Sequence, residues 1–220
     1  MTADTDRAVA VEARVRPAVE ARLATLGLHW GAPALLRVFK QSSELELWLA
    51  DASGRFVLFD TFAICRSSGA LGAKLREGDH QAPEGFYAVT PAALNPRSRY
   101  HLSFDLGFPN AFDRAHGRTG SYLMVHGGCV SVGCYAMGDD AIETIYTVVA
   151  AALGHGQPFV PVHALPFRFD DSWQHAHRDS PWLAFWMNLA EGDALFRRGH
   201  REPSVDVRDG RYVFRQGRSR

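Results

Sequence analysis

The strongest constraint on the fold lies between residues 44 and 64. Leucine occupies every second position from 45 to 49 and alternates with glutamate or tryptophan, which is the period-two pattern of a strand with two different faces. The sequence Asp-Ala-Ser-Gly follows at 51–54 and is typical of a tight turn. A second apolar run covers residues 56–64. The segment therefore predicts a β-hairpin that feeds a larger sheet.

Further short strands are expected at residues 85–90, 100–104 and 122–125, separated by loops rich in Gly, Pro, Asn and Ser. These loops are longer than simple connections need, and loops on a rigid scaffold often carry binding or catalytic residues. The loop at 65–74 has a cationic residue near each end. The middle of the chain is thus predicted to be mostly β with long loops.

Helices are expected on both sides of this β-rich part. An Ala-, Val- and Arg-rich helix should cover residues 5–26, where Pro17 is expected to limit or kink it. A second helix is predicted to start at Asp140, with Glu143 three positions later as in a capping box, and to end at Gly154. Its isoleucines, valines and leucines recur on one face, which indicates packing against a core.

A third helix is predicted to begin with Ser180 as its N-cap and Pro181 at the first helical position. Its aromatic side is expected to belong to the core. This order of elements predicts an α+β, β-rich fold with flanking helices. We expect an N-terminal helix or linker over 1–30, the main domain over 31–165, and a C-terminal helical extension packed on the same domain over 166–220.

The charge balance argues against some classes of function. The chain has 24 Lys and Arg and 24 Asp and Glu, so no global field attracts nucleic acid or an anionic membrane. No apolar run reaches the roughly 20 residues of a membrane span, and residues 1–11 lack the apolar core of a secretory signal. These features predict a soluble protein without a nucleic-acid partner. His175 and His177 lie near several aspartates without the register of a helical metal site, and we expect neither a metal nor a cofactor.

The chain has only three cysteines, Cys65, Cys129 and Cys134. Because the number is odd, at least one thiol should stay unpaired within the chain. Cys129 and Cys134 have C-x4-C spacing without a second cysteine pair, so a structural zinc site would have to recruit distant histidines. That zinc site is a minor alternative.

Residues 125–135 concentrate the chemistry, with one histidine, two cysteines and three glycines between a predicted strand and a predicted helix. A thiol attacks a carbonyl as the thiolate, so Cys134 needs its pKa lowered by a nearby His126 and by the positive end of a helix. His126 can take the thiol proton and return it to a leaving amine, and the N–H groups of Gly133 and Cys134 are candidate oxyanion donors. The alternative is that both cysteines are small buried residues and His126 is a hydrogen-bonded core histidine.

The pattern His126-Gly127 followed by Ser131-Val132-Gly133-Cys134 resembles the HG…SxGC signature of the YkuD-type L,D-transpeptidase catalytic domain. More narrowly, the chain resembles the murein L,D-transpeptidase branch called YafK-like or DpaA-like. The similarity covers most of the chain. In order, the matching segments are residues 39–40, 45–48, 65–74, 77–79, 83–87, 109–113, 126–137, 166–168 and 185–189.

This resemblance implies that residues 31–165 form a β-rich catalytic domain with Cys134 as nucleophile and His126 as base. It also implies that the carbonyl of Gly127 orients the imidazole and that Gly133 belongs to the catalytic turn. The implied substrate is peptidoglycan stem peptide containing meso-diaminopimelate. Members of the wider family join stem peptides or attach lipoprotein to them, whereas the narrower branch cuts the diaminopimelate–lysine link to murein lipoprotein. Both reactions run through a thioester, and the implied location is the periplasm.

One departure from the wider family concerns the recognition of the substrate carboxylate. That family usually has an apolar residue and then arginine after the catalytic cysteine, whereas Tyr135-Ala136-Met137 stands here. An amino-acid centre needs a cation for its carboxylate, so another residue should supply it. Each cationic candidate has the alternative of a solvated surface charge. The candidate substrate-binding residues are Ser131, Arg66, Lys74, Asn110, Arg118 and Tyr135.

Cys65 and Cys129 are predicted to be structural and near one another, with a disulfide between them left open. Three functions stay open at this point. The leading hypothesis is a hydrolase that cuts the diaminopimelate–lysine bond, and the second is a transpeptidase that passes the same acyl group to an amine. The third is a non-catalytic peptidoglycan-binding module, which the joint presence of His126, Gly133 and Cys134 disfavours. The oligomeric state does not follow from the sequence.

Overall fold

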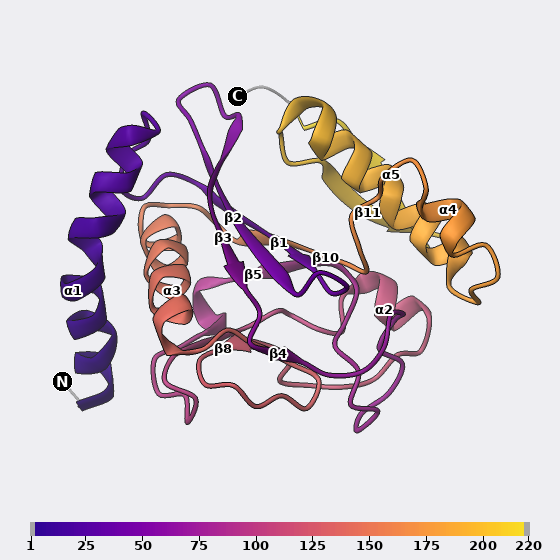
Figure 1. The fold of residues 1–220 in the computed structure, drawn as a ribbon, viewed down its shortest axis with the longest axis horizontal. Helices are drawn as coiled ribbons and strands as arrows, with labels where there is room; N and C mark the ends of the chain where they lie inside the picture. The colour runs from indigo at the N-terminus through magenta and orange to yellow at the C-terminus, as the bar shows by residue number, and fades with distance from the viewer. Residues whose placement is uncertain (1–2, 218–220) are drawn as a thin grey trace.

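The computed structural model describes residues 3–217 and places a five-stranded sheet at the centre of the molecule (Figure 1). One neighbouring pair in this sheet, the first and tenth strands of the chain, is parallel, and the others are antiparallel. In spatial order the strands are β3 (Phe56–Ala63), β2 (Glu44–Ala50), β1 (Ala34–Phe39), β10 (Val160–Leu165) and β5 (Gly85–Val89).

A second sheet of shorter strands lies below the first in the view of Figure 1. Its spatial order is β4 (Arg66–Ser67), β9 (Tyr135–Ala136), β8 (Met124–His126), β7 (Ser103–Asp105) and β6 (Leu94–Asn95). Strands β8 and β9 are parallel, while the remaining pairs are antiparallel. A short 3-10 helix, η1 (Pro91–Ala93), precedes β6. Near the C-terminus β11 (Ser204–Arg208) and β12 (Arg211–Arg215) form a separate hairpin.

The helices cover the two sides of the central sheet (Figure 1). Helix α3 (Asp139–Gly154) contacts strands of both sheets, and α1 (Ala3–Thr25) packs against its outer side. Helices α4 (Trp173–Ala176) and α5 (Leu183–Gly199) lie on the opposite side together with the C-terminal hairpin. The short α2 (Ala111–Ala115) lies between β7 and β8 in the chain. None of the helices within 3–217 is long and apolar enough to cross a membrane.

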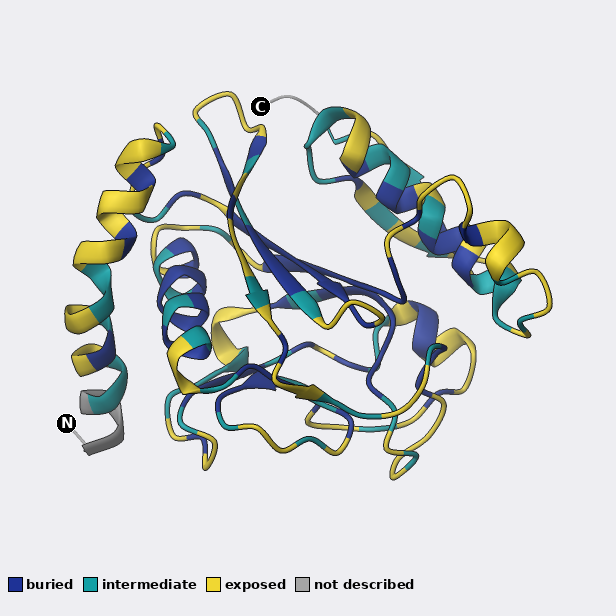
Figure 2. Ribbon diagram, viewed as in Figure 1, coloured by how far each residue is buried: buried dark blue, intermediate teal, exposed yellow. Residues whose placement is uncertain are grey.

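The inner strands β1 and β10 of the central sheet are buried on both faces, as their dark colour in Figure 2 shows. On β1, Leu36 and Val38 belong to the large core that includes α1, α3 and the second sheet. Leu35 and Phe39 point the other way, into smaller clusters that involve α5. Successive residues of a strand face opposite sides, so a strand between two layers is apolar on both. This arrangement holds the second sheet firmly against the first.

The predicted hairpin at 44–64 is confirmed as β2 and β3, and the predicted α+β, β-rich fold with flanking helices is confirmed as well. The strands predicted at 85–90 and 122–125 correspond to β5 and β8, each within two residues of the expected ends. The strand predicted at 100–104 starts later, with β7 at Ser103. The C-terminal extension predicted as helical also contains the β11–β12 hairpin, and its helix packs on the central sheet.

Three helix boundaries or features differ from the predictions. Helix α1 continues across Pro17, because Val11, Val19 and Leu23 are buried on both sides of the proline and packing offsets the lost hydrogen bond. Helix α3 begins at Asp139 after Gly138, with no side-chain cap, so the predicted capping box is absent.

Helix α5 begins at Leu183, two residues after Pro181, the predicted first helical position. Ser180 instead holds a turn, in which the N–H of Trp182 donates to its hydroxyl at 3.2 Å and the N–H of Leu183 donates to its carbonyl. A serine–proline pair favours a turn as well as a helix start, and the turn is formed here.

Candidate active site

The pairing of two short strands sets the relative placement of Cys134 and His126. Strands β8 and β9 run parallel, with Val125 opposite Tyr135 and His126 opposite Ala136. Because Val125 and Tyr135 point into the core, Met124, His126 and Cys134 share the other face of this sheet. The N–H of Met124 donates to the Cys134 sulfur at 3.4 Å. The nucleophile candidate and the base candidate therefore lie on one face of adjacent strands.

The imidazole of His126 is buried and has a defined tautomer. Its Nδ1 lies 2.6 Å from the carbonyl oxygen of Gly127, and a carbonyl only accepts, so Nδ1 carries the proton. Nε2 is then the unprotonated nitrogen, able to accept a proton. The Tyr100 ring packs at 4.7 Å from the imidazole. Burial lowers the pKa of His126, against the opposing effect of the Gly127 bond, and this keeps the ring neutral.

Two glycines shape the turn between the strands. A Cβ on Gly127 would stand 2.7 Å from an Asp139 carboxylate oxygen and 2.7 Å from the Tyr100 carbonyl, so no side chain fits there. Gly133 has φ of +97°, a conformation that side chains disfavour. The same Asp139 carboxylate accepts the N–H of Gly128 at 2.8 Å. Close packing and a strained φ thus require glycine at 127 and 133.

Hydroxyl groups brace the backbone around Cys134. Ser131 Oγ accepts the N–H of Cys134 at 3.1 Å and donates to the carbonyl of Cys134 at 2.6 Å. The N–H of Gly133 donates to Ser68 Oγ. The two N–H groups predicted as oxyanion donors are therefore engaged by serine hydroxyls in this structure. Ser131 acts on the backbone of the nucleophile, and Ser68 was not singled out by the sequence.

The electrostatic setting of Cys134 differs from the sequence prediction. Cys134 is followed by strand β9, and helix α3 starts only at Asp139, so Cys134 does not stand at the entrance of that helix as predicted. Burial raises the pKa of the thiol, and the nearby Asp105 carboxylate adds to this, while the Met124 N–H and Lys74 act against it. The prediction of a lowered pKa is therefore wrong for the resting protein. Both shifts favour the uncharged forms of the thiol and the imidazole.

A disulfide joins Cys65 to Cys129, with the two Cα atoms 5.4 Å apart. Cys65 lies directly before β4, which pairs with β9 immediately after the nucleophile. The bond thus ties the turn that carries Cys134 to the strand that delivers Ser68. Cys134 is the free cysteine. The predicted proximity of Cys65 and Cys129 is confirmed, and the disulfide that was left open is present.

A buried ion pair anchors the loop that follows β4. Lys40 Nζ donates to Glu84 at 2.9 Å and to the carbonyls of Ala70, Gly72 and Ala82. Both side chains are almost fully buried. Burying two charges is expensive unless each is fully hydrogen-bonded, and this network meets that condition. Lys40 and Glu84 therefore position the loop that contains Ser68.

The three cations predicted to bind a substrate carboxylate are in different states. Arg66 is exposed on β4, opposite Ala136 in the register. Lys74 is 4% exposed and pairs with Asp79 at 2.6 Å. Against the effect of burial, Lys74 and three backbone N–H groups lower the pKa of Asp79 to about 2. Arg118 is likewise buried, in an ion pair with Asp113 at 2.9 Å. Of these three, only Arg66 is open to solvent.

The remaining two predicted binding residues hold the fold together. Asn110 caps α2, and its amide donates to the Phe86 carbonyl and to the Tyr212 hydroxyl, each at 2.8 Å. The Tyr135 ring is fully buried, and its hydroxyl donates to the carbonyl of Pro83 at 2.6 Å. Neither side chain is free to contact a substrate in this arrangement. No group of three or more potential metal-ligating side chains gathers within the described part of the chain.

Comparison with known proteins gives a clear relationship. No family model matches the chain. The Escherichia coli K12 protein named "Putative L,D-transpeptidase YafK" is 44% identical over 183 residues, which is 83% of this chain and 74% of that protein. The protein of the same name from Escherichia coli O157:H7 matches to the same extent.

Among solved structures, the helical cell shape determining protein Pgp2 of Campylobacter jejuni superposes with a TM-score of 0.51 at 18% identity, covering 82% of this chain and 75% of Pgp2. A point mutant of Pgp2 gives a TM-score of 0.51 at 20% identity, where the match covers 75% of this chain and 56% of the mutant chain. At such identity the likeness concerns the fold. The sequence match to YafK, together with the shared fold, establishes that the chain belongs to the YafK branch of the peptidoglycan-related L,D-transpeptidase family.

Proposed function

We propose that the protein is a cysteine-dependent acyl-transfer enzyme that acts on peptidoglycan peptide through a thioester on Cys134. One observation carries this proposal. The bond from His126 Nδ1 to the Gly127 carbonyl leaves Nε2 as the proton acceptor, on the sheet face that also presents the Cys134 thiol. A non-catalytic binding module has no need of an oriented base beside a thiol.

In the proposed first step, the neutral thiol of Cys134 attacks a substrate carbonyl while His126 Nε2 takes its proton. A neutral thiol and a neutral base suit this concerted route, since no preformed thiolate is required. The carbonyl oxygen of the substrate displaces Ser68 Oγ from the Gly133 N–H and receives that hydrogen bond as its charge grows. His126 then gives the proton to the departing amine, which leaves a thioester on Cys134.

Recognition of the substrate is assigned to the edge of β4. The family acts on peptidoglycan, and a meso-diaminopimelate centre presents a carboxylate near the reacting carbonyl. Arg66 is exposed on the strand next to β9 and can form a bidentate pair with that carboxylate. We place the enzyme in the periplasm. The proposed substrate fits this compartment, and its oxidising conditions suit the Cys65–Cys129 disulfide.

For the fate of the thioester we propose hydrolysis, which releases a lysine-ended peptide from diaminopimelate, with murein lipoprotein as the natural partner. Tyr135-Ala136-Met137 follows the nucleophile, as in the lipoprotein-releasing branch. The test supplies a muropeptide–lysine substrate with and without excess free stem peptide, and identifies the products by mass. Free acid products in both cases support hydrolysis. Dominant cross-linked dimers would assign a transpeptidase with the same Cys134–His126 chemistry.

The chemistry itself is tested by trapping the intermediate. Brief incubation with substrate followed by acid quench should add the mass of the acyl group to the wild-type protein and to Cys65→Ala/Cys129→Ala. The adduct should be absent from Cys134→Ala. If the adduct persists in Cys134→Ala and maps to another residue, the nucleophile is misassigned.

A further inference from the structure

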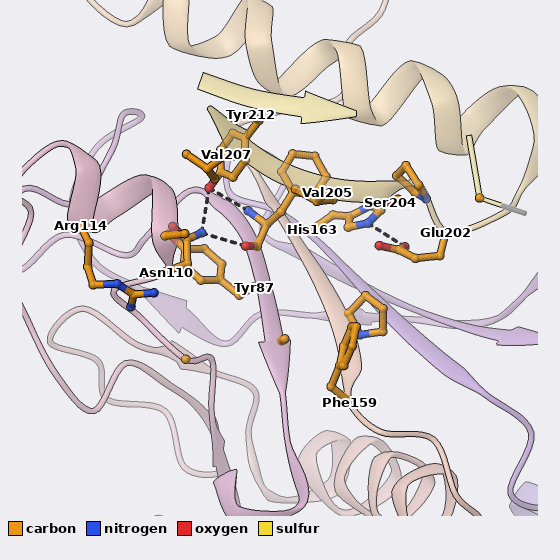
Figure 3. Close-up of a pocket in the computed structure, with 17 residues that line it drawn as sticks. Tyr87, Asn110, Arg114, Phe159, His163, Glu202, Ser204, Val205, Val207 and Tyr212 are labelled. Atoms are coloured by element: carbon orange, nitrogen blue, oxygen red, sulfur yellow. Dashed lines mark hydrogen bonds and ion pairs between the residues drawn. The ribbon is translucent and has the colours of Figure 1, made fainter. Parts of the chain in front are cut away.

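A cleft lies between the edge of the central sheet and the C-terminal hairpin, and Figure 3 shows its lining side chains. Its volume is about 900 Å³, the size of a site for a small molecule or a short peptide. Its apolar lining includes Phe86, Phe159, Pro161, Val205 and Tyr212. None of the residues that line it belongs to the Cys134 turn or its bracing serines. The cleft is therefore separate from the candidate active site.

One wall of the cleft is an edge strand with outward-facing backbone groups. Strand β5 is the last of the central sheet and pairs only with β10. The Phe86 N–H donates to the Tyr212 hydroxyl at 3.3 Å and its carbonyl accepts from Asn110, so both Phe86 groups point away from β10. Backbone direction alternates along an antiparallel strand, so the N–H and carbonyl of Ala88 point outward too.

Ala88 lines the cleft and stands opposite Pro161 of β10, at a non-hydrogen-bonded pair of the ladder. The outward groups of Phe86 are capped by side chains, whereas those of Ala88 face the cleft beside Gly107. An outward-facing N–H and carbonyl pair on an edge strand is the contact that an extended peptide uses to add to a sheet. The backbone thus favours a peptide as the occupant.

The two ends of the cleft carry opposite charges. Arg114 and Glu202 stand at opposite ends of the row of labelled side chains in Figure 3. Glu202 is held by His163, whose Nε2 lies 3.0 Å from the carboxylate. His163 is 1% exposed, and its Nδ1 has no hydrogen-bond partner among the described residues. The buried imidazole thus holds the Glu202 carboxylate at this end of the cleft.

From these features we infer that this cleft is an accessory binding site for a short, extended peptide that carries a free carboxylate and a free amine. The carboxylate pairs with Arg114, the amine with Glu202, and the peptide backbone hydrogen-bonds to Ala88. Peptidoglycan stem peptide has this chemistry, and its choice as the natural ligand rests on the proposed function. The site would hold a second stem peptide away from Cys134 and keep the enzyme on its polymeric substrate.

The test uses the full chain with Cys134→Ala, so that no turnover competes with binding. The probe is the free stem tetrapeptide L-alanyl-γ-D-glutamyl-meso-diaminopimelyl-D-alanine, titrated while backbone amide NMR signals are followed. Saturable shifts are expected at Ala88, Gly107 and Val205, in addition to any at residues 126–134. Shifts confined to residues 126–134, or no saturable shifts at millimolar peptide, would overturn the inference.

Two cleft variants and a matched control sharpen this test. Arg114 is exposed, and its guanidinium donates to the Pro109 carbonyl. Arg114→Ala loses only this surface bond and should keep the fold, and we expect about five- to tenfold weaker binding to the cleft. Ala88→Pro removes the outward N–H while the ladder bonds to β10 stay in place, so it should weaken the peptide-induced shifts at Gly107 and Val205. The control is Arg178→Ala, another exposed arginine that does not line the cleft. Equal binding in Arg114→Ala and Arg178→Ala would contradict the assignment of the carboxylate.

A chemical variant of the probe gives an independent readout. Each carboxylate of the tetrapeptide is converted to an amide in turn. For the carboxylate that contacts Arg114, the amide should lower the binding affinity as much as Arg114→Ala does, and combining the two changes should cause no further loss. Full additivity for every carboxylate would contradict a direct Arg114 contact. The outcome does not depend on turnover. If wild-type protein fails to process sacculi while the cleft still binds tetrapeptide, the proposed function fails and the peptide cleft stands.

Discussion

The turn that carries Cys134 and the cleft beside β5 are built in opposite ways. The turn is about ten residues long, and its glycines, histidine and serine contact one another within it or through the adjacent strand. The residues that line the cleft are spread along the sequence from Phe86 to Gly217, and its two ends carry charges. The turn is rigid because backbone groups are bonded within it, whereas the cleft depends on how separate layers pack.

This difference teaches where each kind of function can tolerate change. The proposed acyl transfer requires the reacting atoms to be positioned to within roughly half an ångström, and bonded backbone groups and a disulfide restrict the movement of the turn that would carry them. Peptide binding by an edge strand needs only an exposed N–H and carbonyl and two charges at suitable separation. Substitutions should therefore affect the two regions on different scales.

The largest effect is expected from Cys134→Ala. Removing the nucleophile should lower kcat by at least about 10³-fold on the muropeptide–lysine substrate, because no other group can form the thioester. The cleft lies outside the turn, so its tetrapeptide signals should persist. Turnover is measured by mass analysis of released lysine peptide, with thermal melting to show that the fold is kept. Residual activity within tenfold of wild type would mean that another residue attacks the substrate.

The disulfide should matter more for stability than for chemistry. Cys65 and Cys129 are 64 residues apart, and a closed loop of that length contributes about 4 kcal/mol to the free energy of unfolding. Cys65→Ala/Cys129→Ala should lose stability of that order in urea unfolding. Its kcat, measured well below the melting temperature, should fall much less than that of Cys134→Ala. A stable variant without turnover would show that the bond sets the geometry of the site.

A smaller effect is expected for Ser131→Ala. The serine hydroxyl both accepts the Cys134 N–H and donates to the Cys134 carbonyl, so its loss frees two backbone groups of the nucleophile. We expect a loss of about 1–2 kcal/mol in stability and a decrease in kcat of about tenfold. Ser131→Thr keeps the hydroxyl and serves as the matched control. Equal kcat in both variants and wild type would show that the Ser131 hydroxyl is not needed to hold the turn in place.

The smallest effect is a displacement of the pH profile. Burial lowers the pKa of His126 below its ordinary value of 6.5, so the base stays neutral and active to lower pH than a free histidine. Burial raises the pKa of the Cys134 thiol above its ordinary value of 9.0, so the proton needed for the leaving amine is retained to higher pH. Turnover should show a plateau from below pH 6.5 to above pH 9.

Alkylation of Cys134 by iodoacetamide reports the same difference directly. Its pH midpoint should lie above 9.0, because the buried thiol resists ionisation. The control is Cys134→Ala, which has no other free cysteine within the described residues. A midpoint near neutrality would indicate a thiolate–imidazolium pair in the resting enzyme and would overturn the neutral-pair mechanism.

The local patterns of the sequence were sufficient for several structural predictions. Alternating leucines predicted the β2–β3 hairpin, and the apolar face of α3 was apparent from residues 142–153. Helix ends were predicted less well, because Ser180 and Asp140 can satisfy backbone groups in a turn as well as in a helix. The fates of the predicted carboxylate binders also did not follow from the sequence. Lys74 and Arg118 pair with Asp79 and Asp113, whose positions depend on loop packing, whereas Arg66 is exposed.

The sequence by itself determined which candidate residues the Cys134 turn contains. His126, Gly127, Ser131, Gly133 and Cys134 are close in the chain, and their contacts are made by one strand, one turn and the next strand.

Only the tertiary structure decided what surrounds that turn. Ser68 reaches Gly133 across 65 residues of chain, and Lys40 holds Glu84 from another strand. The tertiary structure also raised the pKa of the Cys134 thiol, because desolvation depends on the layers packed around it. Residues close in sequence constrain each other locally, whereas contacts between distant segments exist only after the sheets, helices and hairpin have packed.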